Sequence, residues 1–155
     1  MCYTIYMSKA FTLIEIIIVM AIIAVLATIA TMGMANARTN KVLEITAKNI
    51  VFSLEEAKGK SLSGKGGENH GIYFTASSFT TFNGASYSAL DPENFTETID
   101  SKISIVNTAP SNSVIFSRVT GNANAVATIT VRETDDVSNS ITINVGALGD
   151  INMVQ

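Results

Sequence analysis

The chain has 155 residues with a formal net charge of −3, and charged residues make up only 15% of it, well below the roughly 25% typical of a soluble globular domain. The deficit is concentrated in residues 11–37, where 21 of 27 residues are apolar and Glu15 is the one charged residue. We therefore expect neither a wholly soluble protein nor one with several membrane spans, and residues 38–155 suffice for one small domain.

The first elements in chain order are a short leader, residues 1–10, and a long apolar helix. Residues 16–37 carry no charge, and a helix of that length extends about 33 Å against a hydrocarbon core of about 30 Å. The sequence therefore predicts a single membrane-spanning helix over residues 11–37. The only cysteine, Cys2, precedes this segment, so the folded part is expected to have no internal disulfide.

A helical period continues from Lys41 to Lys60, and no proline separates it from the apolar segment. Two acid-first pairs at spacing i,i+4, Glu44 with Lys48 and Glu56 with Lys60, support this helix. Glycines between residues 59 and 67 are expected to end it. The apolar positions predicted to share one face are Val42, Ile45, Ile50, Leu54 and Ala57.

After Gly67 the sequence changes to short alternating runs separated by turn residues, which predicts an antiparallel β-rich region over residues 68–155. Asn83-Gly84 and the stretch from Asp135 to Asn139 are the expected reversals. The fold class is thus α+β, with a long N-terminal helix packed on a C-terminal antiparallel sheet. The predicted strands are Gly71–Thr75, Ser78–Phe82, Lys102–Val106, Ser113–Val119, Ala125–Glu133, Ser140–Val145 and Ile151–Val154.

The run Lys9-Ala10-Phe11-Thr12-Leu13-Ile14-Glu15, followed by the uncharged segment, resembles the class III signal of type IV prepilins and type II secretion pseudopilins. The resemblance implies that a prepilin peptidase cuts between Ala10 and Phe11 and methylates the new N-terminus. It also implies that Glu15 pairs with the N-terminal amine of a neighbouring subunit during assembly. One departure concerns the residue before the cut, which is almost always glycine in that family and is Ala10 here.

The C-terminal half is similar to the GspH/FimT-type minor pilins, through Gly71-Ile72-Tyr73-Phe74, Val114-Ile115-Phe116 and the two alternating runs that end at Gly146. The implied function is structural: a minor pilin or pseudopilin of a type IV pilus or a type II secretion pseudopilus. Its expected partners are other pilin subunits, prepilin peptidase and the inner-membrane assembly platform. The expected location is the inner membrane, with the C-terminal domain outside the cytoplasm, and then a surface or periplasmic filament.

Three alternatives remain open, and the first is a major pilin of the same system. A DNA-uptake or adhesion subunit is the second. The third is a secreted β domain, because Ala35-Asn36-Ala37 fits an ordinary secretory cleavage site. Isolated cations and the absence of a basic run argue against nucleic-acid binding. We do not expect an enzyme, because the sequence has no catalytic constellation. His70 is the single histidine and is expected at the surface, and no cofactor or metal is expected. A turn at Asp135 and Asp136 could bind calcium only weakly.

Overall fold

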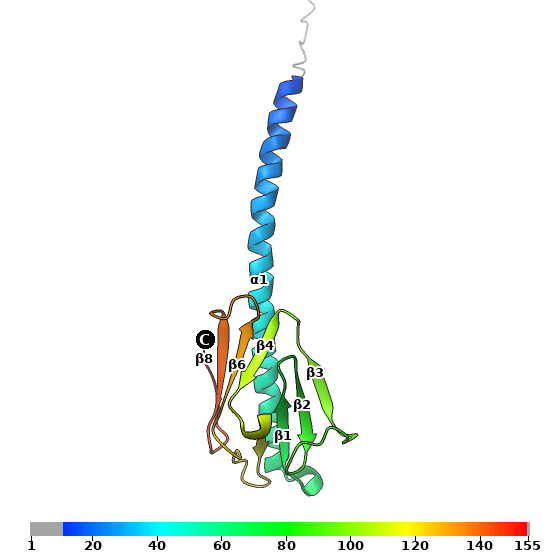
Figure 1. Cartoon of the computed structure of the whole chain (residues 1–155), viewed down its shortest axis with the longest axis vertical. Coiled ribbons are helices and arrows are strands. Elements are labelled where there is room, and N and C mark those ends of the chain that lie inside the picture. Colours follow the sequence, from blue (N-terminus) through cyan, green and yellow to red (C-terminus); the bar gives the residue numbers. More distant parts are fainter. Residues whose placement is uncertain (1–10, 155) are drawn as a thin grey trace, which may run out of the picture. The chain divides into compact units, whose positions relative to one another are not determined.

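The computed structural model describes residues 11–154, with the backbone alone for residues 29–36. The leader, with Cys2 and Ala10, lies outside this range. The helix α1 runs from Leu13 to Leu62 (Figure 1), and the predicted continuation of the apolar helix into the amphipathic one is confirmed. The chain divides into two compact units, Met1–Arg38 and Thr39–Gln155, which are described separately below.

In the second unit, eight strands form two four-stranded antiparallel sheets beside the C-terminal part of α1 (Figure 1). The orders are β3-β2-β1-β5 in one sheet and β4-β6-β7-β8 in the other. The strands are β1 His70–Phe74, β2 Ser78–Asn83, β3 Phe95–Thr98, β4 Ile103–Asn107, β5 Ser113–Phe116, β6 Ala127–Glu133, β7 Ser140–Val145 and β8 Ile151–Val154.

The hairpin of β6 and β7 shows why alternating residues form these sheets. Val131 lies opposite Ile141 and Ile129 lies opposite Ile143, and these four side chains are buried while the threonines between them are half-buried. Side chains two residues apart share one face of a strand, so the apolar series covers the core. The predicted reversal between Asp135 and Asn139 is confirmed.

One face of α1 completes the core of this unit. Its buried apolar side chains belong to the same cluster as the inward residues of both sheets, as expected of a helix packed on sheets. The prediction for this face is correct at four positions, including Val42, which is half-buried and packs against the core. It is wrong at Ile45, which is 47% exposed. The buried apolar residues of the helix are Leu43, Ala47, Ile50, Leu54 and Ala57.

Seven predicted strands are present, two with the predicted bounds and five with at least one shifted end, and one strand was missed. The missed strand, β3, is an edge strand whose residues are mostly exposed, so it lacks an apolar alternation. The strand predicted to reach Val119 ends at Phe116, because Val119 has a φ of 71°, a conformation that a β-branched residue rarely adopts. The Asn83-Gly84 turn starts a longer connection rather than a tight hairpin, since the next strand begins at Phe95.

Candidate assembly site at the start of the helix

The first turn of α1 is capped by Thr12. The backbone N–H of Glu15 donates to Thr12 Oγ1 at 3.3 Å and to the Thr12 carbonyl oxygen at 3.1 Å. Thr12 is therefore the N-cap, and Glu15 occupies the third helical position, where the pair matches the Thr-x-x-Glu pattern of a capping box. A carboxylate in this turn also interacts favourably with the positive end of the helix dipole.

Apolar side chains surround the described part of the helix up to Leu26. Their exposed fractions lie between 48% and 77%, and they occupy every side of the helix rather than one stripe. A helix that is apolar all round needs a covering of lipid or of other protein. The exposed residues are Phe11, Leu13, Ile14, Ile16, Ile17, Ile18, Val19, Met20, Ile22, Ile23, Val25 and Leu26.

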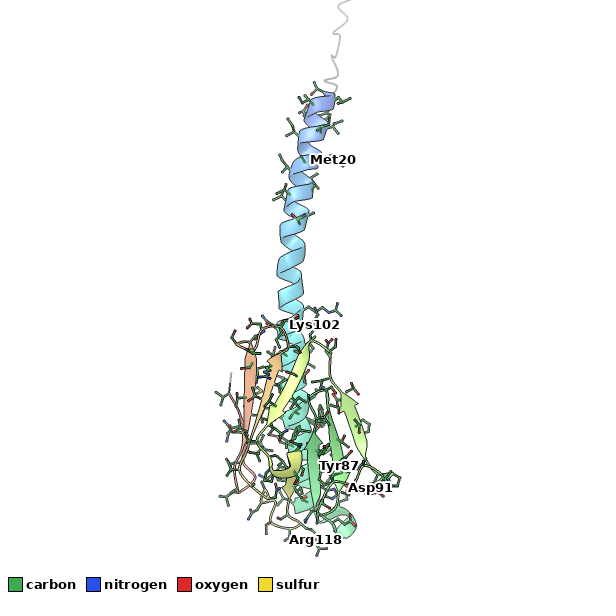
Figure 2. All side chains as sticks on the ribbon, viewed as in Figure 1. Met20, Tyr87, Asp91, Lys102 and Arg118 are labelled. Atoms are coloured by element: carbon green, nitrogen blue, oxygen red, sulfur yellow. The ribbon has the colours of Figure 1, made fainter. Side chains whose placement is uncertain are left out.

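Glu15 lies within this apolar surface. A shallow hollow of about 250 Å³ is lined by Phe11, Glu15, Ile16, Val19 and Met20; Figure 2 labels Met20 on this part of the helix. The carboxylate is thus the one charged group of the hollow, in contact with apolar neighbours. Of the predicted site residues, the structure places Phe11 and Glu15 one helical turn apart, and Ala10 lies outside the described residues.

Sequence reasoning missed the structural role of Thr12. The signal was readable, because a threonine three residues before a glutamate and directly before an apolar run indicates a capping box. Glu15 consequently has two separable properties, its position in the cap and its charge. A glutamine at this position keeps the first and removes the second.

His70 was predicted at the surface, and this prediction is wrong. The residue is 4% exposed. Its Nδ1 lies 2.6 Å from Asn83 Oδ1 and its Nε2 lies 3.0 Å from the Lys65 carbonyl oxygen. Asn83 in turn donates from Nδ2 to Glu93 Oε2 at 2.7 Å. Lys65 lies five residues before His70 in the loop after the helix, and Asn83 ends the strand β2. His70 therefore ties this loop to the sheet.

Two carboxylates outside the apolar segment have lowered pKa values. Hydrogen bonds from Lys48 and then Lys41, together with their charges, lower the pKa of Glu44. The side chain and then the backbone N–H of Ser138 lower the pKa of Asp136. Among the described residues, no group of three histidine, cysteine or acidic side chains is placed to hold a metal ion.

The late cations of the second unit lie in different places on its β-rich part. Figure 2 shows Lys102 and Arg118 at opposite ends of the β-rich part. Arg118 donates from Nη1 to the Gly67 carbonyl oxygen at 2.8 Å, and Arg132 lies opposite Ser104 in the ladder of β4 and β6. Clustered cations supply most of the affinity for nucleic acid, and Arg118 is separated from Lys102 by the length of the β-rich part.

The comparisons with known proteins agree with the motif and the fold. The family profile described as the prokaryotic N-terminal methylation motif matches residues 6–31. No curated protein sequence matches the chain.

Solved structures of two other proteins share the fold of about three-quarters of this chain. The chain is similar to the type IV minor pilin FimU of Pseudomonas aeruginosa, with 12% identity, a TM-score of 0.60, and coverage of 73% of this chain and 93% of that one. It is also similar to the minor pseudopilin EpsH of the type 2 secretion system of Vibrio cholerae, with 11% identity, a TM-score of 0.56, and coverage of 72% and 95%. These similarities show that the chain has a pilin-like fold, and the motif at residues 6–31 is of the N-terminal methylation type.

The membrane-spanning helix expected over residues 11–37 is not shown. Within residues 11–154, no described helix meets the combined length and hydropathy needed to cross a membrane. The span stays a prediction from the uncharged run of residues 16–37.

Proposed function

We propose that this chain is a non-enzymatic subunit, a minor pilin or pseudopilin, of a type IV pilus or a type II secretion pseudopilus. The observation that carries the proposal is the combination of an N-terminal methylation motif at residues 6–31 with a fold shared by a minor pilin and a minor pseudopilin. Either feature alone would be weaker, because the motif covers a short segment and the structural similarity has low sequence identity.

Maturation is the first step of the proposed mechanism. Prepilin peptidase cuts between Ala10 and Phe11, which removes the leader and leaves Phe11 as a methylated N-terminus. Alanine before the cut is small, like the usual glycine, and is compatible with this step. Cleavage places a cationic amine directly before the capped turn that holds Glu15.

The apolar helix then serves two environments in succession. In the membrane, lipid covers the side chains of residues 11–26; in the filament, the same side chains pack against helices of neighbouring subunits. Their exposure of about half or more in the isolated chain supports this exchange, because burying apolar area contributes about 25 cal/mol per Å² in either setting. When the helix moves from the membrane into the filament, the apolar area that is buried therefore changes little.

Glu15 gives the packed helices their axial register. A carboxylate in an apolar contact is costly unless it is paired, and the N-terminal amine of Phe11 on a neighbouring subunit is the partner that the family resemblance implies. The pairing requires the amine and the carboxylate to lie at one level, so it selects one stagger between helices. The inner-membrane assembly platform is the expected partner that drives this step.

The test is to isolate filaments from cells that express the chain with a C-terminal tag, with and without prepilin peptidase. The tag follows β8, whose last described residue, Val154, is 54% exposed, so it should not disturb the core. We expect the processed chain in the filament fraction only when the peptidase is present. A chain that is processed but never enters any filament fraction would contradict the proposal.

A further inference from the structure

A groove with no role in the proposed assembly lies on the outer face of the sheet β3-β2-β1-β5. Ile72, Phe74, Val114 and Phe116 point to the core shared with the helix, so the residues that alternate with them face outward. The groove has a volume of about 390 Å³. The lining side chains used below are Tyr73, Tyr87, Ser86 and Ser111.

Two stacked tyrosines form one wall of the groove. The rings of Tyr73 and Tyr87 lie 4.0 Å apart between centroids and within 3° of parallel, and the edge of Phe82 meets Tyr87 at 5.6 Å. Tyr87 comes from the connection between β2 and β3 (Figure 2). Gly71 permits this arrangement, because a Cβ there would lie 2.9 Å from the Phe82 ring. The aromatic wall is therefore fixed by contacts on the sheet.

The lining of the groove offers uncharged hydroxyl groups. Tyr73, Tyr87, Ser86 and Ser111 line the groove, and within residues 11–154 none of their hydroxyls has a protein hydrogen-bond partner. No charged side chain is among the described residues of the lining. Both tyrosines are only half-buried, so a ligand can reach them.

The opposite rim has an unusual backbone. Ser111 and Asn112 have φ values of 51° and 56°, which are two successive non-glycine residues in the left-handed region. They belong to the short turn Pro110–Asn112 before β5, where the N–H of Asn112 donates to the Ala109 carbonyl oxygen at 3.1 Å. Backbone strain of this kind persists where the surrounding structure holds the residues in place, and strained residues are found most often at active and ligand-binding sites.

From this combination we infer that the groove binds a short neutral oligosaccharide. A pyranose ring has an apolar C–H face that packs on an aromatic wall, and its hydroxyls donate and accept hydrogen bonds as the free hydroxyls of the lining do. The absence of a cation in the lining disfavours phosphate or carboxylate ligands. The volume falls within the usual range of small-molecule sites. The inference goes beyond filament assembly and does not depend on it.

The test titrates the full chain with cellotriose and with N-acetylated chitotriose (called chitotriose below), both neutral, and uses trigalacturonic acid as the charged comparison. The protein is kept in a polyoxyethylene detergent, because a sugar-headed detergent would compete. Saturation-transfer NMR and calorimetry should report binding of a neutral trisaccharide with a Kd of about 1 mM or tighter. Binding of neither neutral trisaccharide, or tighter binding of trigalacturonic acid, would overturn the inference.

Variants locate the binding in the groove. Tyr87→Ala should weaken it at least about fivefold, and Tyr87→Phe, which keeps the stacked ring, about two- to threefold. Ser111→Gly should also weaken binding while the melting temperature stays the same or rises, because glycine relieves the positive φ. Val137→Ser, at an exposed residue of another turn, should bind as the parent does. Unchanged binding by Tyr87→Ala would overturn the inference.

A photo-crosslinker at Ser86 distinguishes a sugar site from a contact between subunits. If the groove binds sugar, assembled filaments should give no crosslink from this position to a neighbouring subunit, and cellotriose or chitotriose should reduce labelling of an added photoreactive sugar. A subunit-to-subunit crosslink that excludes sugar would show a protein interface and overturn the inference. Failure of the filament proposal would leave the titration in detergent unaffected.

Discussion

The replacement of Glu15 by glutamine separates the charge of this residue from its position in the helix cap. Glutamine is accepted at the third position of a capping box, so the turn held by Thr12 Oγ1 and the Glu15 N–H should stay intact. The side-chain size is nearly unchanged, and the apolar hollow around it should keep its shape. What the variant loses is the carboxylate that the proposed assembly pairs with a neighbouring amine.

The expected magnitude follows from the environment of the carboxylate. Removing one partner of a buried charge pair costs about 3–5 kcal/mol, and 3 kcal/mol corresponds to a factor of about 100 or more in an equilibrium. If Glu15 interacted only with its own helix dipole, the loss would be about 0.3–1 kcal/mol, which is about fivefold at most. Pairing of Glu15 with a neighbouring subunit and interaction with its own helix dipole therefore predict losses of filament incorporation that differ by more than tenfold.

The assay compares the filament-to-membrane ratio of the tagged chain for the parent, Glu15→Gln and Thr12→Ala. Thr12→Ala is the matched control, because it removes the cap at a cost of about 0.5–2 kcal/mol and leaves the carboxylate. We expect Glu15→Gln and Thr12→Ala both to be cleaved. Glu15→Gln should be depleted from filaments about 100-fold, and Glu15→Ala, which also lacks the carboxylate, by the same factor. Incorporation of Glu15→Gln within fivefold of the parent would refute the register argument and leave Glu15 as a capping residue.

The remaining predictions concern a fragment of residues 39–154. It should fold without a disulfide or metal. Leu54→Ala should lower its free energy of unfolding by about 3 kcal/mol, and Ile45→Ala, on the same helix, should lower it by less than about 1 kcal/mol. Urea unfolding followed by circular dichroism checks this, and equal losses would contradict the helix packing. The ion pairs of Glu44 lower its pKa below the ordinary value of 4.5, so they stabilise the fold above that pH and are lost as pH falls through the lowered value. Glu44→Gln should therefore reduce the loss of stability at acid pH. An unchanged dependence of stability on pH would contradict the role given to these ion pairs. The fragment should not shift duplex DNA at physiological salt, and a salt-dependent shift at about micromolar concentration would contradict this prediction and show that its cations bind phosphate together.

Local patterns predicted the regular elements because those elements are set by neighbours in sequence. The alternation in residues 127–133 and 140–145 defines a buried and an outer face, and the ion pairs Glu44–Lys48 and Glu56–Lys60 form at the spacing of a helical turn. The helix face was harder, since Ile45 is apolar yet exposed. Apolar character alone does not identify which of two adjacent stripes meets the sheets.

Long-range partners account for the errors. His70 is buried because Asn83 and the Lys65 carbonyl oxygen meet its ring, and neither contact follows from sequence spacing. The tyrosine groove likewise joins the strand β1, the connection after β2 and the turn before β5. Of the candidate assembly site, the motif at Phe11 and Glu15 was readable from sequence because its residues are contiguous, and the cap at Thr12 could have been.

The mass of the mature chain, measured intact and by N-terminal peptides after extraction from membranes and filaments, tests the central claim most directly. The account predicts an N-terminus at Phe11 that carries one methyl group, with the leader through Ala10 removed. It also predicts that this form is absent from cells without prepilin peptidase. A mature N-terminus at Arg38, or a chain that keeps its leader in assembled filaments, would contradict it.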